Sequence, residues 1–219
     1  LIIICTPLST YKNILDKISK YIMPNSILTD VGSTKLNVVK IFSKLKNVKF
    51  NILPAHPIAG TEKSGPESGF AELFNKRWCV ITPIGKNNKL SLDKLKKLWN
   101  IFGSKVQIMD AENHDKILAI TSHMPHLISY AIVSSSLNAN SKEKSQIIKF
   151  SAGGFRDFTR IAASDPTMWR DIFLNNKKNL LKIIVEFEKS LNLIKEYIKK
   201  NKSDKLQEVF VNTKKIRKL

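Results

Sequence analysis

The sequence predicts an α/β fold, a mostly parallel β-sheet with helices on its faces, followed by an all-helical domain. Short apolar runs alternate with amphipathic stretches over roughly the first hundred residues, and this alternation is typical of a parallel sheet covered by helices. From residue 111 the strand-like runs cease and long helical patterns replace them. We therefore predict two domains, residues 1–109 and residues 110–219.

Five strands and three helices are predicted in the first domain. Continuous apolar runs are typical of strands that are buried on both faces, and here they are LIIIC (1–5), SILTDVG (26–32), VKFNILPA (48–55), WCVITPI (78–84) and KVQIMD (105–110). The helical patterns are YKNILDKISKYI (11–22), STKLNVVKIFSKL (33–45) and SLDKLKKLWNIFG (91–103). Gly103 is a natural C-terminal stop, and Ser33 could simply cap the helix that follows it.

The second domain is predicted to be helical throughout. A long helix at 111–139 contains Pro125, which should bend the helix or free a carbonyl group. A short helix is expected at 141–150. Asp165 and Pro166 form a typical N-cap and first position of the next helix.

The helix predicted at 176–200 carries a heptad-like apolar seam. The seam can pack inside its own domain or against a second copy of the chain, and the pattern leaves both open. Its members are spaced by 4, 3, 4, 3 and 4 residues: Leu180, Ile184, Phe187, Leu191, Ile194 and Ile198. Residues 201–219 are predicted to form a basic helical tail.

The composition excludes several classes of function. The net charge of +19 could indicate nucleic-acid binding, but the lysines are spread along the chain without interleaved aromatic residues, so we predict no nucleic-acid role. A positive cleft would instead attract small anions.

No apolar run reaches the roughly 18 residues of a membrane span, and we predict no membrane association. Cys5 and Cys79 are expected to be buried thiols in a reducing, cytoplasmic compartment. No zinc-like spacing predicts a metal site.

Polar groups follow three of the predicted strands. Thr6 and Pro7 follow the first strand. The four residues GSTK (32–35) follow the second strand, and His56 and Pro57 follow the third. Ligands of open parallel sheets bind beyond the carboxyl ends of the strands, so we expect these residues at one edge. A lone histidine there would more often be an ordinary hydrogen-bonded loop residue, and it is the cluster that favours a site.

The second domain supplies another group of polar residues. His123 and His126 are predicted to lie one turn apart on one helical face. Arg156, Asp157 and Arg160 suggest a partly buried ionic site, because arginine can grip a carboxylate through two hydrogen bonds. A purely structural ion-pair network is the alternative.

These motifs together resemble one family. DVGSTK, HPIAGTEKSG, SHMPHLISYA and GGFRDFTRIAASDPTMWRDI occur in the order found in the prephenate and arogenate dehydrogenases of tyrosine biosynthesis, and the resemblance covers nearly the whole chain. It implies a Rossmann-type domain that binds NAD or NADP, with NAD slightly preferred, and a helical domain that forms a homodimer. It further implies oxidative decarboxylation of prephenate to 4-hydroxyphenylpyruvate, or of arogenate to tyrosine.

The resemblance also implies roles for single residues. His56 corresponds to the catalytic histidine that accepts the proton of the substrate's ring hydroxyl. Ser33 corresponds to the serine that contacts this hydroxyl and orients the histidine near the nicotinamide. With Ser33, the strand-end residues Thr6 and Pro7 are the expected cofactor contacts.

The implied substrate contacts lie mostly in the helical domain. Arg160 corresponds to the arginine that holds a substrate carboxylate, and Asp157 is expected in the ionic network around it. The remaining expected pocket residues are His126, Trp169, Thr61 and Glu62.

One expected motif is missing from the sequence. The family begins with a strand and a GxGxxG turn that cradles the cofactor pyrophosphate, whereas this chain starts with LIIIC. We expect LIIIC to match the family's fourth strand and the earlier segment to be needed for activity. The alternative function is a degenerate, non-catalytic helical dimerisation module, which the retention of Ser33, His56, His126 and Arg160 disfavours.

Overall fold

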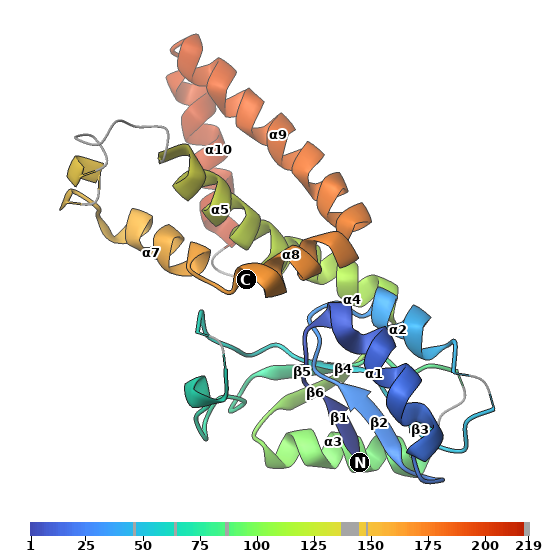
Figure 1. Ribbon diagram of the computed structural model, residues 1–219. Helices are drawn as coiled ribbons and strands as arrows, with labels where there is room; N and C mark the ends of the chain where they lie inside the picture. The colour runs from blue at the N-terminus through green and yellow to red at the C-terminus, as the bar shows by residue number, and fades with distance from the viewer. Residues whose placement is uncertain (46, 64, 86–87, 137–144, 148, 217–219) are drawn as a thin grey trace.

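The computed structural model describes residues 1–45, 47–63, 65–85, 88–136, 145–147 and 149–216. Strands and their covering helices form the N-terminal half, and helices form the C-terminal half, which rises from one end of the first (Figure 1). The α/β class followed by helices is therefore confirmed.

Four of the predicted strands form as single strands, and the third is broken in two. The first three strands pair in parallel in the order β1 (Ile2–Ile4), β2 (Ile27–Asp30) and β3 (Asn51–Ile52). A second sheet has the order β4 (Ala55–Pro57), β5 (Trp78–Ile81) and β6 (Lys105–Ile108). The break falls at Pro54, because a proline has no N–H to donate to a ladder.

The direction of the chain reverses within the second sheet. β4 pairs with β5 in antiparallel fashion, and β5 pairs with β6 in parallel. The sheet is mostly parallel, as predicted, but the strands after residue 77 run against the first three. The carboxyl end of the third predicted strand therefore stays beside those of β1 and β2.

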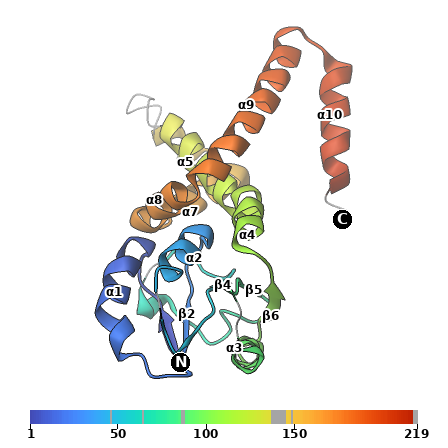
Figure 2. The same ribbon diagram turned by 90° about the vertical axis from the view of Figure 1, so that its right-hand side faces the viewer.

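Helices cover both faces of the strands (Figures 1 and 2). α1 (Tyr11–Ile18) and α2 (Leu36–Phe42) share one apolar core with Leu28 of β2. α3 (Lys89–Ile101) shares the other core with Ile27, the neighbouring residue of the same strand. Successive side chains of a strand point to opposite faces, so the two cores lie on opposite sides. Short 3₁₀ turns occupy Leu8–Thr10, Ser19–Tyr21 and Pro66–Ser68.

The two cysteines differ in exposure. Cys79 is buried in β5, as predicted, whereas Cys5 is exposed because β1 ends at Ile4. The prediction was wrong for Cys5, which lies just past the ladder.

The helical half begins with one continuous run made of three parts. They are α4 (Ala111–Leu118), a π-helical turn (Ala119–His123) and α5 (Met124–Ser136). The predicted disturbance by Pro125 takes the form of this π turn, in which the Met124 N–H donates to the Ala119 carbonyl. A wider turn accommodates the missing N–H and the bulk of the ring one residue later.

The rest of the half consists of α7 (Gly153–Ala162), α8 (Pro166–Asn175), α9 (Lys177–Lys199) and α10 (Ser203–Ile216). Asp165 caps α8 by accepting from the Met168 N–H at 2.7 Å, and Pro166 is its first residue, as predicted. Of the helix expected at 141–150, residues 145–147 are helical, and residues 141–144 and 148 lie outside the described residues.

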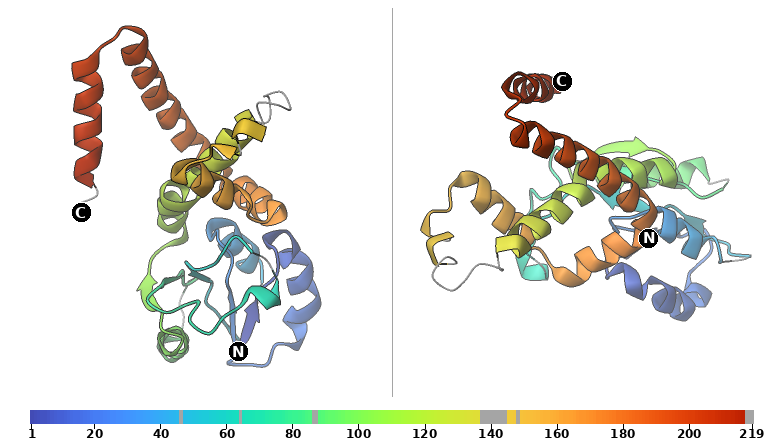
Figure 3. Two further views of the ribbon diagram at one scale, coloured as in Figure 1. Left: turned by 90° about the vertical axis from the view of Figure 1, so that its left-hand side faces the viewer. Right: turned by 90° about the horizontal axis from the view of Figure 1, so that it is seen from above.

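The apolar seam of α9 is mostly left uncovered. Leu180 is buried, but Leu191 is 52% and Ile198 61% exposed. α9 and α10 project from the body of the molecule and are joined only at their turn (Figures 2 and 3). Of the two interpretations of the seam, this exposure favours self-association.

One helical run passes a length and composition test for a membrane span. Residues Ala111–Ser136 include a window with a mean hydropathy of 1.3, of which 28% is buried. A core helix of a soluble protein passes the same test, so this run alone is weak evidence for a membrane.

Candidate active site

His56 lies at one end of a buried chain of three polar side chains. It occupies the middle of β4 and is 7% exposed. Its Nδ1 is 2.8 Å from Nε2 of His114 on α4, and Nδ1 of His114 is 2.8 Å from Oδ1 of the neighbouring Asp115. The chain of contacts therefore joins the sheet half to the first helix of the helical half.

The surroundings of His56 keep its imidazole neutral. Burial is the largest cause that lowers the pKa of His56 well below its usual value, and the nearby His114, Lys35 and His123 lower it further. An imidazole that is neutral at pH 7 has a lone pair with which to accept a proton.

Asp115 also caps a helix of the other half. Its carboxylate accepts from the Lys35 N–H at 2.7 Å and from the Leu36 N–H at 3.0 Å, at the start of α2. Ser33 does not cap this helix, so that ordinary structural role was wrongly predicted. Ser33 is half-buried, and no hydrogen bond of its hydroxyl is found within the described part of the chain.

A buried ion pair joins the end of β2 to the residue that precedes α2. Lys35 Nζ contacts Asp30 Oδ2, and both side chains are fully buried. Burial lowers the pKa of Lys35, while the Asp30 charge raises it. Asp30 also accepts from the Ala55 N–H through Oδ1 at 3.1 Å. Because Ala55 precedes His56, this bond fixes β4 against the end of β2.

The expected cofactor residues gather at the carboxyl ends of β1 and β2. Ile4 is opposite Asp30 in the ladder, so Thr6 and Pro7 emerge beside Ser33. Thr6 and Pro7 are exposed, and the Thr6 hydroxyl is 2.7 Å from that of Thr10.

Gly32 is required at this edge by close packing. A Cβ on Gly32 would lie 2.6 Å from Leu8 Cδ2 and 2.9 Å from Asp30 Oδ2. Since real Cβ atoms essentially never come that close, any other residue would force the neighbouring side chains or the turn itself to shift.

His126 and Trp169 form a stacked pair. Their ring centroids are 3.5 Å apart with an interplanar angle of 19°. His126 Nδ1 donates to the Ser122 carbonyl at 3.0 Å, which leaves Nε2 for a ligand. Burial lowers the pKa of His126, and the charge of Arg160 lowers it further.

His123 is buried deeper than His126 and has an unusual environment. Its Nδ1 accepts from the Asn176 amide at 3.0 Å, and its Nε2 has no hydrogen-bond partner within the described residues. Burial lowers the pKa of His123 to about 4. His123 and His126 both contact Trp169, with ring centroids 6.2 Å and 3.5 Å away, so they share one helical face as the spacing predicted.

The arginine cluster is more exposed than predicted. Arg160 Nη1 is 3.8 Å from Glu62 Oε2, and Arg160 Nη2 is 3.4 Å from Asp157 Oδ1. The Arg160 side chain is 53% exposed, and Arg156 and Thr61 are exposed as well. The prediction of a partly buried ionic site was wrong in this respect. Exposed pairs of this kind are weak, so Arg160 can exchange its partners for a ligand carboxylate.

The site combines a neutral base with an exposed cation whose present partners are weakly held. His56 contacts His114, and the rings of His123 and His126 both contact Trp169. Such a site can remove a proton from an anionic substrate. No group of three or more metal-ligating side chains occurs in the described ranges.

The sequence reasoning missed three members of this site: Asp30, His114 and Asp115. Two signals pointed to them. Asp30 is a charge inside an otherwise apolar strand pattern, and His114 and Asp115 sit in the NHD triplet at the domain boundary.

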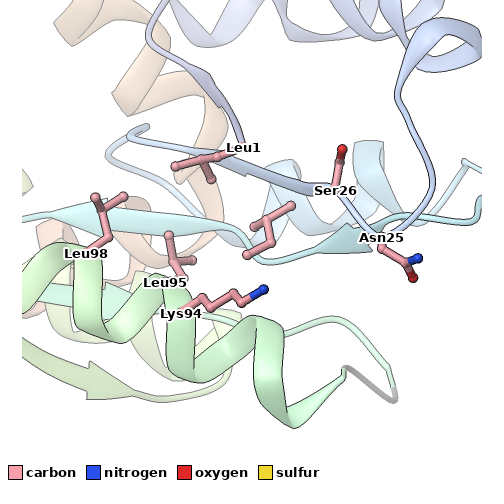
Figure 4. Close-up of a pocket in the computed structure, with 7 residues that line it drawn as sticks. Leu1, Asn25, Ser26, Lys94, Leu95 and Leu98 are labelled. Carbon is pink, nitrogen blue, oxygen red and sulfur yellow. The ribbon is translucent and has the colours of Figure 1, made fainter.

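A separate pocket lies at the other end of the strands (Figure 4). It has a volume of about 280 Å³ and is lined by Leu1, Asn25, Ser26, Ile27, Lys94, Leu95 and Leu98. These residues include those that precede β1 and β2, so the pocket opens at the amino ends, away from His56.

Comparison with known families agrees with this geometry. Residues 1–108 match the family described as "Prephenate dehydrogenase, nucleotide-binding domain", and residues 110–212 match "Prephenate dehydrogenase, dimerization domain". The two matches together cover most of the chain.

Individual proteins of this family are similar to the chain over nearly its whole length. The chain is 35% identical to the cyclohexadienyl dehydrogenase of Zymomonas mobilis over 99% of this chain and 74% of that protein. It is 33% identical to the prephenate dehydrogenase of Bacillus subtilis over 97% of this chain and 57% of that protein.

Solved structures show the same relationship. The prephenate dehydrogenase of Aquifex aeolicus, in complex with hydroxyphenyl propionate and NAD+, matches with a TM-score of 0.89 and 38% identity, over 98% of this chain and 74% of that one. The arogenate dehydrogenase of Synechocystis shares the fold, with a TM-score of 0.81 and 24% identity over 98% of this chain and 77% of that one. On the evidence of both family matches and these identities, the chain belongs to the prephenate dehydrogenase family.

Proposed function

We propose that this chain carries the catalytic residues of an NAD(P)-dependent oxidative decarboxylation. The substrate is either prephenate, which yields 4-hydroxyphenylpyruvate, or arogenate, which yields tyrosine. The observation that carries the proposal is a buried, neutral His56 whose Nδ1 contacts His114 of α4, the helix that continues through the π turn into α5, where His126 stacks on Trp169. The names of the Zymomonas, Bacillus and Aquifex relatives support the same reaction.

His56 acts as the general base. It accepts the proton of the ring hydroxyl as hydride leaves the carbon that bears this hydroxyl. The bond from the ring to its carboxylate then breaks, carbon dioxide leaves, and the bonding electron pair completes the aromatic ring. The ring oxygen finally regains a proton from the imidazolium, so His56 ends the cycle neutral.

NAD(P), when bound, would be the hydride acceptor. The residues that would hold its nicotinamide end are Thr6, Pro7 and Ser33, at the carboxyl edge of β1 and β2. They fit this role because Thr6 and Pro7 are exposed and the Ser33 hydroxyl has no hydrogen-bond partner in the described chain. The turn at Gly32 has no room for a side chain, which lets the backbone stay close to that edge.

Arg160 holds a substrate carboxylate. Its weak contacts with Glu62 and Asp157 are replaced by a charge-assisted, two-pronged grip on the substrate. His126 and Trp169 form the wall of the pocket, with Thr61 and Glu62 at its mouth. The excess of positive charge favours capture of an anion with one or two carboxylates.

The helical half is proposed to form a homodimer. An apolar groove of about 340 Å³ runs between α5 and α9, and its lining consists of Leu127, Ile128, Ala131, Ile132, Ser135, Phe187 and Leu191. Uncovered apolar surface of this kind is typical of an interface, and the match to a dimerization domain supports the assignment. Domain limits of 1–109 and 110–219, preference for NAD and a cytoplasmic location stay predictions.

The test is formation of reduced cofactor, followed by its absorbance, with prephenate and arogenate offered separately and with NAD+ and NADP+ compared. It is run on this chain and on a version that carries, ahead of Leu1, a strand and a GxGxxG turn of the kind that the family resemblance implies. Turnover with either substrate supports the proposal. A folded protein without turnover in both versions would instead favour the non-catalytic dimerisation module.

A further inference from the structure

We propose that His114 and Asp115 are positioning residues that hold His56 in one tautomer, with its Nε2 as the proton acceptor. The proposal rests on the proposed function for its catalytic meaning, but its structural content can be measured without turnover. Neither residue was singled out by the sequence motifs, and both are fully or almost fully buried, at 0% and 1% exposed.

The tautomer follows from the direction of the hydrogen bonds. Both oxygens of Asp115 act as acceptors, Oδ1 for the Lys35 N–H and Oδ2 for the Leu36 N–H, and a carboxylate has no hydrogen to donate. His114 must therefore donate through Nδ1, and its Nε2 is left as an acceptor. His56 in turn must donate through Nδ1 across the 2.8 Å contact. The Nε2 of His56 is then the nitrogen with the free lone pair.

The same chain of bonds disperses the charge that forms during the reaction. When His56 Nε2 takes up a proton, a cation appears in a buried position, which is unfavourable unless it is paired. The Nδ1–H of the imidazolium faces His114, and the far side of His114 faces the Asp115 carboxylate. The carboxylate therefore stabilises the protonated base through one intervening ring, while the base itself stays neutral at rest.

The fold explains why these residues can reach His56. Asp110 caps α4 by accepting from the Asn113 N–H at 2.8 Å, and the helix begins at Ala111. This start sets the rotation of α4 so that positions 114, 115 and 118 are buried. Helix α4 also packs against α2, and the capping of α2 by Asp115 holds the carboxylate in place.

Nitrogen-15 NMR of the histidine rings in this chain tests the assignment directly. The sequence contains four histidines, so single replacements assign every ring. At pH 7 we expect His56 to be protonated at Nδ1 and unprotonated at Nε2, and His114 to show the same tautomer. The opposite tautomer of His56, or an equal mixture, would overturn the proposal whether or not the chain is active.

Two variants extend the test to the reaction. His114→Phe removes the acceptor, and Asp115→Asn removes the charge. In a serine protease, changing the aspartate that sets a histidine tautomer lowers kcat by about 10⁴-fold. Here we expect a fall of roughly 10²-fold or more in kcat, with KM changed by less than about threefold. Lys116→Gln on the exposed side of α4 is the matched control, and neither its kinetics nor its ring spectrum should change.

The pH profile separates positioning from general damage. The titratable groups that face or influence His56 are His114 and Asp115 on α4, His123 in the π turn, Lys35 before α2 and Cys79 on β5. Without the carboxylate, the protonated base loses stabilisation, so the acidic limb of kcat should move to lower pH in Asp115→Asn. An unmoved limb with lower activity would assign a merely structural role and contradict the proposal. If His114→Phe does not fold, the ring spectrum of the unaltered chain still decides.

Discussion

At the scale of single residues, His56 was the part of the site that the sequence predicted best. Its position after an apolar run predicts a place at the ligand-binding edge, and in the structure it lies within β4, directly after Ala55, whose N–H donates to Asp30 of β2. Its two partners were missed because they lie 58 and 59 residues further along the chain, and nothing local connects them. A side chain's role can be inferred from its own strand, whereas its tautomer depends on distant contacts.

Replacement of His56 by asparagine should remove the base without filling the pocket. Loss of a general base typically costs 10²–10⁴-fold in rate, so we expect His56→Asn to lower kcat by about 10³-fold while substrate affinity changes little. Steady-state kinetics on the active form and calorimetric titration of substrate check the two parts. Weakened binding with normal turnover would show that His56 is a binding group instead.

Arg160 should affect binding more than chemistry. A hydrogen bond to a charged group contributes about 1.5–3 kcal/mol, so Arg160→Ala should raise KM roughly 10- to 100-fold with a smaller change in kcat. Arg156→Ala is the control, because Arg156 is exposed on the same helix α7. Equal effects of the two substitutions would refute a specific role for Arg160.

His123 should make stability depend on pH. Its pKa is lowered to about 4 in the folded chain, whereas an unfolded histidine titrates near 6.5. The unfolded state therefore binds the proton first, and the free energy of unfolding should decrease as pH falls from about 6.5 towards about 4. Denaturant unfolding across this range measures the slope, which His123→Gln should reduce. A slope that is the same in both proteins would contradict the buried, neutral state.

At the scale of elements, alternation and caps were predicted well where their causes are local. α8 begins at its Asp-Pro pair and α3 ends before Gly103, as the sequence indicated. The start of α2 was not predictable, since its cap comes from Asp115, 80 residues away in the chain. The antiparallel pairing of β5 with β4 was also not predictable, because an apolar run does not indicate in which direction its strand runs.

The cap of α2 can be tested by comparing two substitutions. Asp115→Ala leaves two N–H groups at the start of α2 without an acceptor, and loss of a cap costs about 0.5–2 kcal/mol. We expect at least that decrease in the free energy of unfolding. Ser33→Ala should change it by only a few tenths of a kcal/mol, since Ser33 is no cap. Equal losses would restore Ser33 as the capping residue.

At the scale of the whole molecule, the exposed seam and groove require a covering surface. The sequence predicted the seam but could not choose between internal and intermolecular packing, because heptad spacing is the same for both. Intermolecular packing is favoured because α9 extends away from the rest of the chain (Figure 2) and leaves Leu191 and Ile198 of the seam exposed.

Dimerisation should depend on this groove. Leu191→Lys places a charge among the groove residues, where burial by a second copy would be unfavourable. We expect sedimentation velocity to show a shift from dimer to monomer at micromolar concentration, with helix content retained. Lys195→Ala on the exposed surface of α9 is the control. A dimer that persists in Leu191→Lys would place the interface elsewhere.

The capping of α2 by a residue of α4 limits how the joint between the two halves can vary in length. Each residue of an α-helix turns the chain by about 100°. One residue inserted between β6 and Ala111, with the helix continuing in register, would rotate His114 and Asp115 away from His56 and from α2 together. Insertions and deletions should therefore be tolerated in the outer loops but not at residues 109–111. A change in length by one residue there would remove both the contact of His114 with His56 and the cap that Asp115 gives to α2.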